Sequence, residues 1–137
     1  MAGINDADEI VRALKSAKTI AVVGCSPNES RPSNAIARYL LRAGFDVIPV
    51  NPGHGEMLDR PCYPDLASIP KDVRIDIVDV FRRSEFVPEI ASAALARGTS
   101  FFWMQDGIVD ENAARRLTAA GIPVAMDRCI FRDHSAL

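Results

Sequence analysis

The sequence is poor in the residues that hold metal ions or form disulfides. It contains three cysteines and two histidines in 137 residues, and the cysteines, Cys25, Cys62 and Cys129, form no C-x-x-C pair. An odd number of widely spaced cysteines is atypical of a disulfide framework, and two histidines are too few to complete a typical zinc cluster. We therefore expect three reduced thiols and no bound metal.

Long apolar runs and an excess of one charge are also missing. The longest runs, at 19–24 and 75–81, are far shorter than the roughly 20 residues that cross a bilayer. The first nine residues carry three acids and have neither the basic nor the apolar part of a secretory signal. A net charge of −2 excludes a general attraction to nucleic acid. These absences predict a cytoplasmic protein with no membrane or nucleic-acid partner.

The sequence does contain enough apolar residues for one ordinary core. Hydrophobic residues make up 48% and charged residues 25% of the chain. A chain of this size hides roughly two thirds of its unfolded surface, without help from disulfides or metals. The length predicts a single domain over residues 1–137.

Short apolar segments alternate with amphipathic ones along the whole chain. Predicted strands cover 19–23, 46–50, 75–80, 100–104 and 123–126, and helices are predicted up to Ala17, up to Gly44, over 84–98 and over 110–120. The stretch 51–72 is expected to be a long connection with one short helix. This alternation predicts an α/β fold, a Rossmann-like doubly wound five-stranded parallel sheet with helices on both faces. We expect the strand order 3-2-1-4-5, with the ligand crevice where strands one and four end.

Polar or glycine-containing segments follow all five predicted strands. They begin at Gly24, Asn51, Phe81, Gln105 and Asp127. Loops are polar in any case, but five such segments at one edge of a parallel sheet favour a ligand site.

The first of these segments departs from the dinucleotide-binding pattern. Gly24, Ser26 and Glu29 occupy the positions of G-x-G-x-x-G, so two of the three glycines are missing. Asn51 stands where an acid would hold the ribose of NAD. A nicotinamide dehydrogenase is therefore disfavoured. The loop still leads into a helix N-terminus, which suits a phosphate, and Arg31 can add positive charge there.

Several segments together resemble a known family. They are AVVGCSPN at 21–28, RPS at 31–33, VIPVNPG at 47–53, DIVDVFRRSE at 76–85, WMQ at 103–105 and MDRC at 126–129. In order and spacing they resemble the small stand-alone CoA-binding proteins, which are similar to the CoA-binding N-terminal domain of the succinyl-CoA synthetase α subunit. The resemblance spans nearly the whole chain, but nothing around His134 resembles the phosphorylated-histidine motif of the synthetase.

The resemblance implies CoA or acyl-CoA as the ligand. It implies contacts from Gly24, Cys25, Ser26, Pro27, Asn28, Asn51, Pro52, His54, Phe81, Arg82, Met104, Gln105 and Gly107. Arg31, placed at the helix N-terminus by the argument above, completes the expected site. His54 stands where the synthetase domain has a lysine, so a group that titrates near neutrality replaces a fixed charge. Arg82 and Arg83 are expected to point to opposite sides, so that one of them faces a phosphate.

Catalytic chemistry has weaker support. Cys25 follows a strand near a helix N-terminus that can lower a thiol pKa, but no base is identified for it. Asp76 and Asp79 lie three residues apart and point to opposite faces of a strand, so they cannot act as a pair. Trp103 is more typical of the core than of a stacked adenine. We expect a binding protein rather than an enzyme. The alternatives are a small CoA- or nucleotide-dependent transferase using Cys25 or Asp127, and a CoA-sensing regulatory module with a protein partner.

Overall fold

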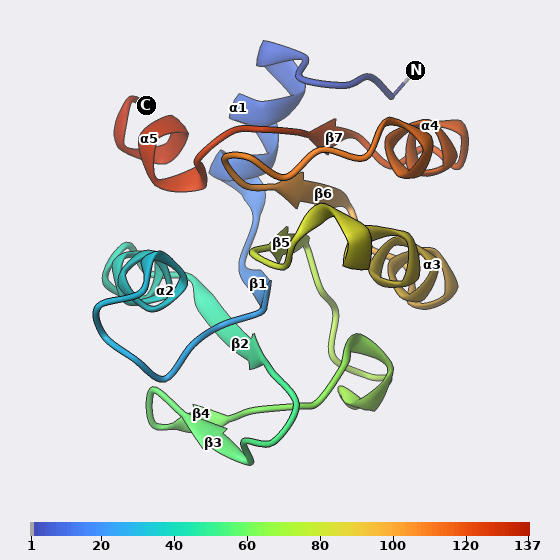
Figure 1. Cartoon of the computed structure of the whole chain (residues 1–137). Coiled ribbons are helices and arrows are strands. Elements are labelled where there is room, and N and C mark those ends of the chain that lie inside the picture. The colour runs from blue at the N-terminus through green and yellow to red at the C-terminus, as the bar shows by residue number, and fades with distance from the viewer. Residues whose placement is uncertain (1) are drawn as a thin grey trace.

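The chain folds into a parallel sheet between two layers of helices (Figure 1). A computed structural model describes residues 2–137, so Met1, the first residue of the predicted domain, lies outside the described residues. The helices are α1 (Ala7–Ser16), α2 (Pro32–Arg42), α3 (Val87–Arg97), α4 (Glu111–Ala119) and α5 (Ile130–Ser135). The sheet strands are β1 (Thr19–Val23), β2 (Asp46–Val50), β5 (Ile77–Val80), β6 (Phe101–Met104) and β7 (Val124–Ala125). The fold class predicted from the sequence is confirmed.

Local sequence signals place most of these elements. The Asp6 carboxylate accepts the Glu9 backbone N–H and caps α1, and α3 ends at Gly98, whose φ of 89° suits glycine. The connection 51–72 holds a two-stranded hairpin, β3 (Glu56–Met57) and β4 (Arg60–Pro61), and the 3₁₀ turn Leu66–Ser68. The short helix expected there is confirmed as a single 3₁₀ turn, whereas α5 was not predicted.

The predicted strand order is wrong in one respect. The observed order is β2-β1-β5-β6-β7, which in the numbering of the five predicted strands reads 2-1-3-4-5. The third predicted strand, which is β5, therefore pairs with the edge of β1 that faces away from β2, rather than with β2. Because the winding reverses between β1 and β5, the crevice of such a sheet lies between the ends of these two strands.

The outer edge of β2 explains this order. Tyr63 forms a parallel bridge with Val50, its N–H donates to the Pro49 carbonyl, and its carbonyl accepts from Asn51. That edge is therefore occupied by the chain just after β4. All four residues of β5 are buried, as a central strand covered on both faces requires.

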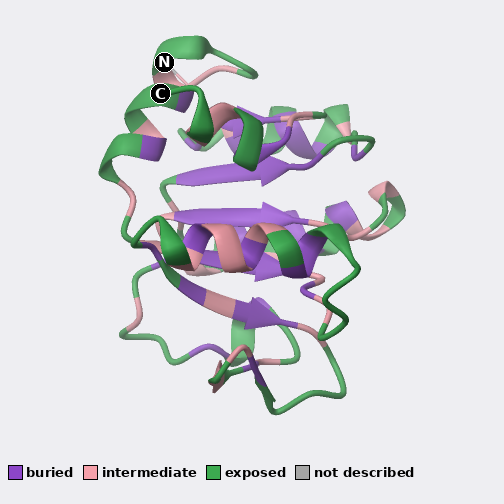
Figure 2. Ribbon diagram, turned by 90° about the vertical axis from the view of Figure 1, so that its left-hand side faces the viewer, coloured by how far each residue is buried: buried purple, intermediate pink, exposed green. Residues whose placement is uncertain are grey.

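Two apolar clusters fill the space between the sheet and the helices. One face of the sheet packs against α3 and α4, and the other against α1, α2 and α5. Figure 2 shows the strands buried throughout most of their length and the helices exposed on their outer sides. Trp103 is fully buried on the α2 side and its Nε1–H donates to the Arg128 carbonyl, which confirms its predicted place in the core.

No helix among residues 2–137 is both long and apolar enough to cross a membrane. Within the same residues, no group of three or more His, Cys, Asp or Glu side chains is placed to hold a metal ion.

Candidate functional site

Three adjoining cavities lie at the carboxyl edge of the sheet. The central cavity, of about 740 Å³, lies between the loop after β1 and the loop after β5, and its wall includes Gly24, Arg31, Phe81 and Arg82. It shares Phe81 and Arg83 with a cavity of about 590 Å³ that we call the Gln105 cavity. It shares Gly24 and Arg82 with a cavity of about 470 Å³ that we call the Glu89 cavity. Together they form a trough across the strand ends.

Gly24 lets the two loops approach each other. Its φ is +88°, and a Cβ atom built on it would lie 3.1 Å from Arg82 Cδ and 3.3 Å from the Arg82 backbone nitrogen. Any side chain here would meet both a strained backbone conformation and the β5 loop. Glycine is therefore needed at the point where the central cavity forms.

The loop after β1 is tied to the first turn of α2. Ser33 Oγ accepts the Ser26 N–H at 2.9 Å, and Asn34 Nδ2 donates to the Ser26 carbonyl at 2.9 Å. Both side chains are buried, which is unusual for these residue types and follows from their hydrogen bonds. The N-terminal end of this helix, with its positive dipole end, is thus held at the wall of the central cavity.

Three guanidinium groups, those of Arg31, Arg82 and Arg83, line the central cavity. Arg82 and Arg83, predicted to point to opposite sides, both line this cavity, and their guanidinium carbons lie 4.0 and 5.6 Å from the centroid of the Phe86 ring. The chain has left β5 by this point, so strand alternation no longer applies. The arrangement concentrates positive charge at one place, where an anion would be bound.

Both flanking cavities combine apolar walls with polar or charged side chains. The Gln105 cavity has apolar walls from Ile36, Phe81 and Ile108, with the Gln105 side chain among them. The Glu89 cavity has apolar walls from Val23, Val50 and Ile90, with the carboxylates of Asp65 and Glu89 at its rim.

The structure brings most of the residues predicted to contact the ligand into this trough. The lining includes Gly24, Ser26, Arg31, Asn51, Pro52, Phe81, Arg82, Gln105 and Gly107. The cavity walls do not include Pro27, Asn28 and His54, which are exposed, nor Cys25 and Met104, which are fully buried. Sequence reasoning did not find the roles of Phe86, Glu89 and Ile108 in the walls, because nothing in their local sequence marks them.

Asp79 lies in the core directly behind the site. It is fully buried, its Oδ1 accepts a 2.6 Å hydrogen bond from Gln105 Nε2, and its Oδ2 has no hydrogen-bond partner. Burial raises the pKa of Asp79 to about 7, although the Gln105 hydrogen bond acts in the opposite direction. A carboxyl group that titrates near neutrality thus adjoins the trough.

The thiol chemistry considered for Cys25 is not supported by its surroundings. Burial raises the pKa of the Cys25 thiol to about 12, the opposite of the lowering that a helix N-terminus can produce. All three cysteines are free and buried, and β5 and β6 separate the strands that precede Cys25 and Cys129. Asp127 accepts the Gly107 N–H at 2.7 Å and joins two loops. Neither residue is placed as an activated nucleophile.

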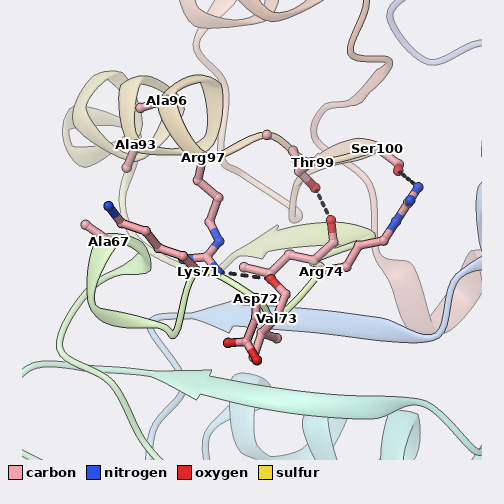
Figure 3. A pocket seen from close by; sticks show the side chains of 12 residues that line it. Ala67, Lys71, Asp72, Val73, Arg74, Ala93, Ala96, Arg97, Thr99 and Ser100 are labelled. Carbon is pink, nitrogen blue, oxygen red and sulfur yellow. Dashed lines mark hydrogen bonds between the residues drawn. The ribbon is translucent and has the colours of Figure 1, made fainter.

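A further groove, of about 750 Å³, opens at the opposite edge of the sheet (Figure 3). Its central guanidinium, from Arg97, donates to the backbone carbonyls of Leu66, Ile69, Pro70 and Val73 at 2.7–3.0 Å. This arginine is fully engaged in holding the chain between β4 and β5. The groove is therefore part of the scaffold rather than a second arginine-based anion site.

Comparisons with known proteins agree with this geometry. The CoA binding domain profile matches residues 18–135. The uncharacterized protein YneT of Bacillus subtilis (strain 168) is 41% identical over 127 residues, which are 93% of each chain. A hypothetical protein from Pyrococcus horikoshii OT3 superposes with a TM-score of 0.90 and 35% identity, over 96% of this chain and 92% of the other. The ADP-forming acetate–CoA ligase I of Archaeoglobus fulgidus is 40% identical over 63 residues, 46% of this chain and 9% of the ligase. The resemblance found in the sequence is confirmed, and the chain belongs to the CoA-binding domain family.

Proposed function

We propose that this protein binds CoA or an acyl-CoA in the trough at the carboxyl edge of the sheet, and that it has no catalytic centre of its own. The observation that carries the proposal is the convergence of Arg31, Arg82 and Arg83 on the central cavity beside the N-terminus of α2. Guanidinium groups and a helix N-terminus are two of the commonest phosphate-binding groups in proteins. Membership of the CoA-binding domain family supports the choice of CoA among phosphate-bearing ligands.

The three cavities match the three parts of CoA. The diphosphate lies in the central cavity against the arginines. The pantetheine arm, which alternates methylene and amide groups, lies in the apolar Gln105 cavity, where one side-chain amide is available. The nucleoside lies in the Glu89 cavity, whose carboxylates can accept hydrogen bonds from the adenine amino group.

A thermal-shift series with CoA, NAD and NADP tests the proposal. CoA is expected to raise the melting temperature by several degrees, because a ligand at 100 times its dissociation constant adds about 2.7 kcal/mol to the free energy of unfolding. NAD and NADP at equal concentration are expected to shift it much less, because Ser26 and Glu29 replace two of the dinucleotide-binding glycines. An equal or larger shift with NAD would overturn the proposal.

Arg82→Ala is expected to weaken CoA binding by about 1–3 kcal/mol, because it removes a charge-assisted hydrogen bond to a phosphate. Isothermal titration calorimetry measures this change. Arg74→Ala is the matched control, since Arg74 lies at the opposite groove and its removal should leave CoA affinity unchanged. If Arg82→Ala folds normally and binds CoA as the wild type does, Arg82 does not contact the phosphates.

A further inference from the structure

A buried hydrogen bond connects the trough to the interior of the sheet. Asp79 lies in register with Val22 of β1 and Trp103 of β6, on the face covered by α2. Gln105, just after β6, donates from Nε2 to Asp79 Oδ1 at 2.6 Å and also lines the Gln105 cavity. The bond therefore runs from a fully buried carboxyl group to the wall of a cavity.

This bond determines which end of the Gln105 amide is left for a ligand. Nε2 is engaged with Asp79. Gln105 Oε1 accepts no hydrogen bond from the described residues. Among those residues, the one side-chain polar atom that is both fully buried and without a partner is Asp79 Oδ2, so Gln105 Oε1, which also has no partner, is not fully buried. Since Gln105 lines the cavity, Oε1 is the end of the amide that remains accessible.

We propose that Asp79 is a positioning residue, which turns the Gln105 carbonyl oxygen toward the cavity and thereby selects a ligand group that donates a hydrogen bond. The inference rests on the proposed function, under which the pantetheine arm occupies this cavity and offers the N–H of a secondary amide. A ligand that presents only an acceptor here, such as a carboxylate, would face another oxygen and leave it unpaired.

Protonation of Asp79 reverses the arrangement. A protonated carboxyl group carries an O–H, which donates to Gln105 Oε1, and the amide then presents Nε2 to the cavity. The proton comes from solvent, and no covalent bond of the ligand changes. Because the pKa of Asp79 is about 7, the carbonyl-out arrangement dominates above neutrality and is lost below it.

Other titratable groups on this face leave Asp79 as the group that responds. The Cys25 thiol lies near it, and the pKa of that thiol, about 12, keeps it neutral over this range. The charged or titratable side chains of α2 and α5 are engaged elsewhere or exposed: Arg38 pairs with Asn34, Arg132 with Asp106, Asp133 with Arg128 and His134 with Tyr39, and Arg42 is exposed. Helix α1 packs on this face through its apolar residues. Its charged side chains Asp8, Arg12 and Lys15 are exposed, and Glu9 accepts the Gly3 N–H.

Calorimetry of CoA binding at pH 6 and pH 8, with the wild type and Asp79→Asn, tests the inference. The Asn side chain is isosteric and donates or accepts equally at every pH, so the Gln105 amide no longer responds to pH. The ratio of the variant's Kd to the wild-type Kd is expected to rise by about threefold to tenfold from pH 6 to pH 8. This is the contribution of one hydrogen bond, which the wild type gains at pH 8 when Gln105 Oε1 faces the ligand N–H. The titration of CoA itself cancels in this ratio.

Two controls locate the effect. Adenosine 3′,5′-bisphosphate lacks the pantetheine arm, so its ratio should be the same at both pH values. In a Gln105→Leu background, adding Asp79→Asn should give a pH-independent ratio for CoA as well. A pH-independent ratio in the original pair, or a pH effect that persists without Gln105, would overturn the positioning role. Absence of CoA binding by the wild type would instead overturn the proposed function, and this inference with it.

Discussion

Replacing Asp79 with Asn is expected to stabilise the protein more at pH 8 than at pH 4. The free energy of unfolding of the variant, relative to the wild type, should rise by on the order of 3–4 kcal/mol between these values. The reason is that burial raises the pKa of Asp79 from 3.8 to about 7, so the folded wild type resists ionisation of this carboxyl group.

The direction follows from proton linkage. Because the folded-state pKa is above the unfolded-state value, the protonated carboxyl contributes stability at low pH, and that contribution is lost as the pH rises from about 4 through about 7. Above pH 7 the folded state holds a buried charge with one hydrogen bond, and its second oxygen has no partner. The Asn side chain has the same shape and no charge, so the variant avoids this cost.

Urea unfolding of both proteins at several pH values measures the difference. Every other titrating group is common to the two proteins, so its contribution cancels in the comparison. A difference in stability that stays constant from pH 4 to pH 8 would show that Asp79 ionises as readily in the folded protein as in the unfolded chain.

Replacing Arg97 with Ala is expected to lower the free energy of unfolding by about 2–4 kcal/mol. Its guanidinium donates four hydrogen bonds to the carbonyls of Leu66, Ile69, Pro70 and Val73, in the segment that crosses from β4 to β5. This segment carries the chain past β1 and so sets the strand order. Without the arginine, partly buried carbonyls lose their donor, and water replaces it only where it can reach them.

Two control variants separate this role from a general effect of charge. Arg116→Ala removes an exposed guanidinium that donates to Ser92 Oγ, and it should change stability by less than about 0.5 kcal/mol. Arg97→Lys keeps the charge but lacks the planar fork that reaches several carbonyls, so it should recover little of the loss. Equal stability of Arg97→Lys and the wild type would show that charge alone is sufficient at this position.

The sequence by itself determined the class of fold and most of the trough. Periodicity is a local property, so the strands at 19–23 and 46–50 and the capped helix after Asp6 could be predicted from neighbouring residues. Parallel strands present their carboxyl ends at one edge, so the segments beginning at Gly24 and Gln105 were predicted to meet there. The resemblance to CoA-binding proteins then led to CoA as the proposed ligand.

Tertiary structure alone decided the strand order and the surroundings of each candidate residue. Local patterns do not show which side of β1 a later strand will join. That choice depends on Tyr63 occupying the outer edge of β2 and on Arg97 holding the crossing segment, both contacts between residues distant in sequence. For the same reason, the sequence could not show that Cys25 is sealed in the core or that Asp79 holds Gln105. Burial and hydrogen-bond partners are set by packing, and packing, rather than residue type, determines their chemistry.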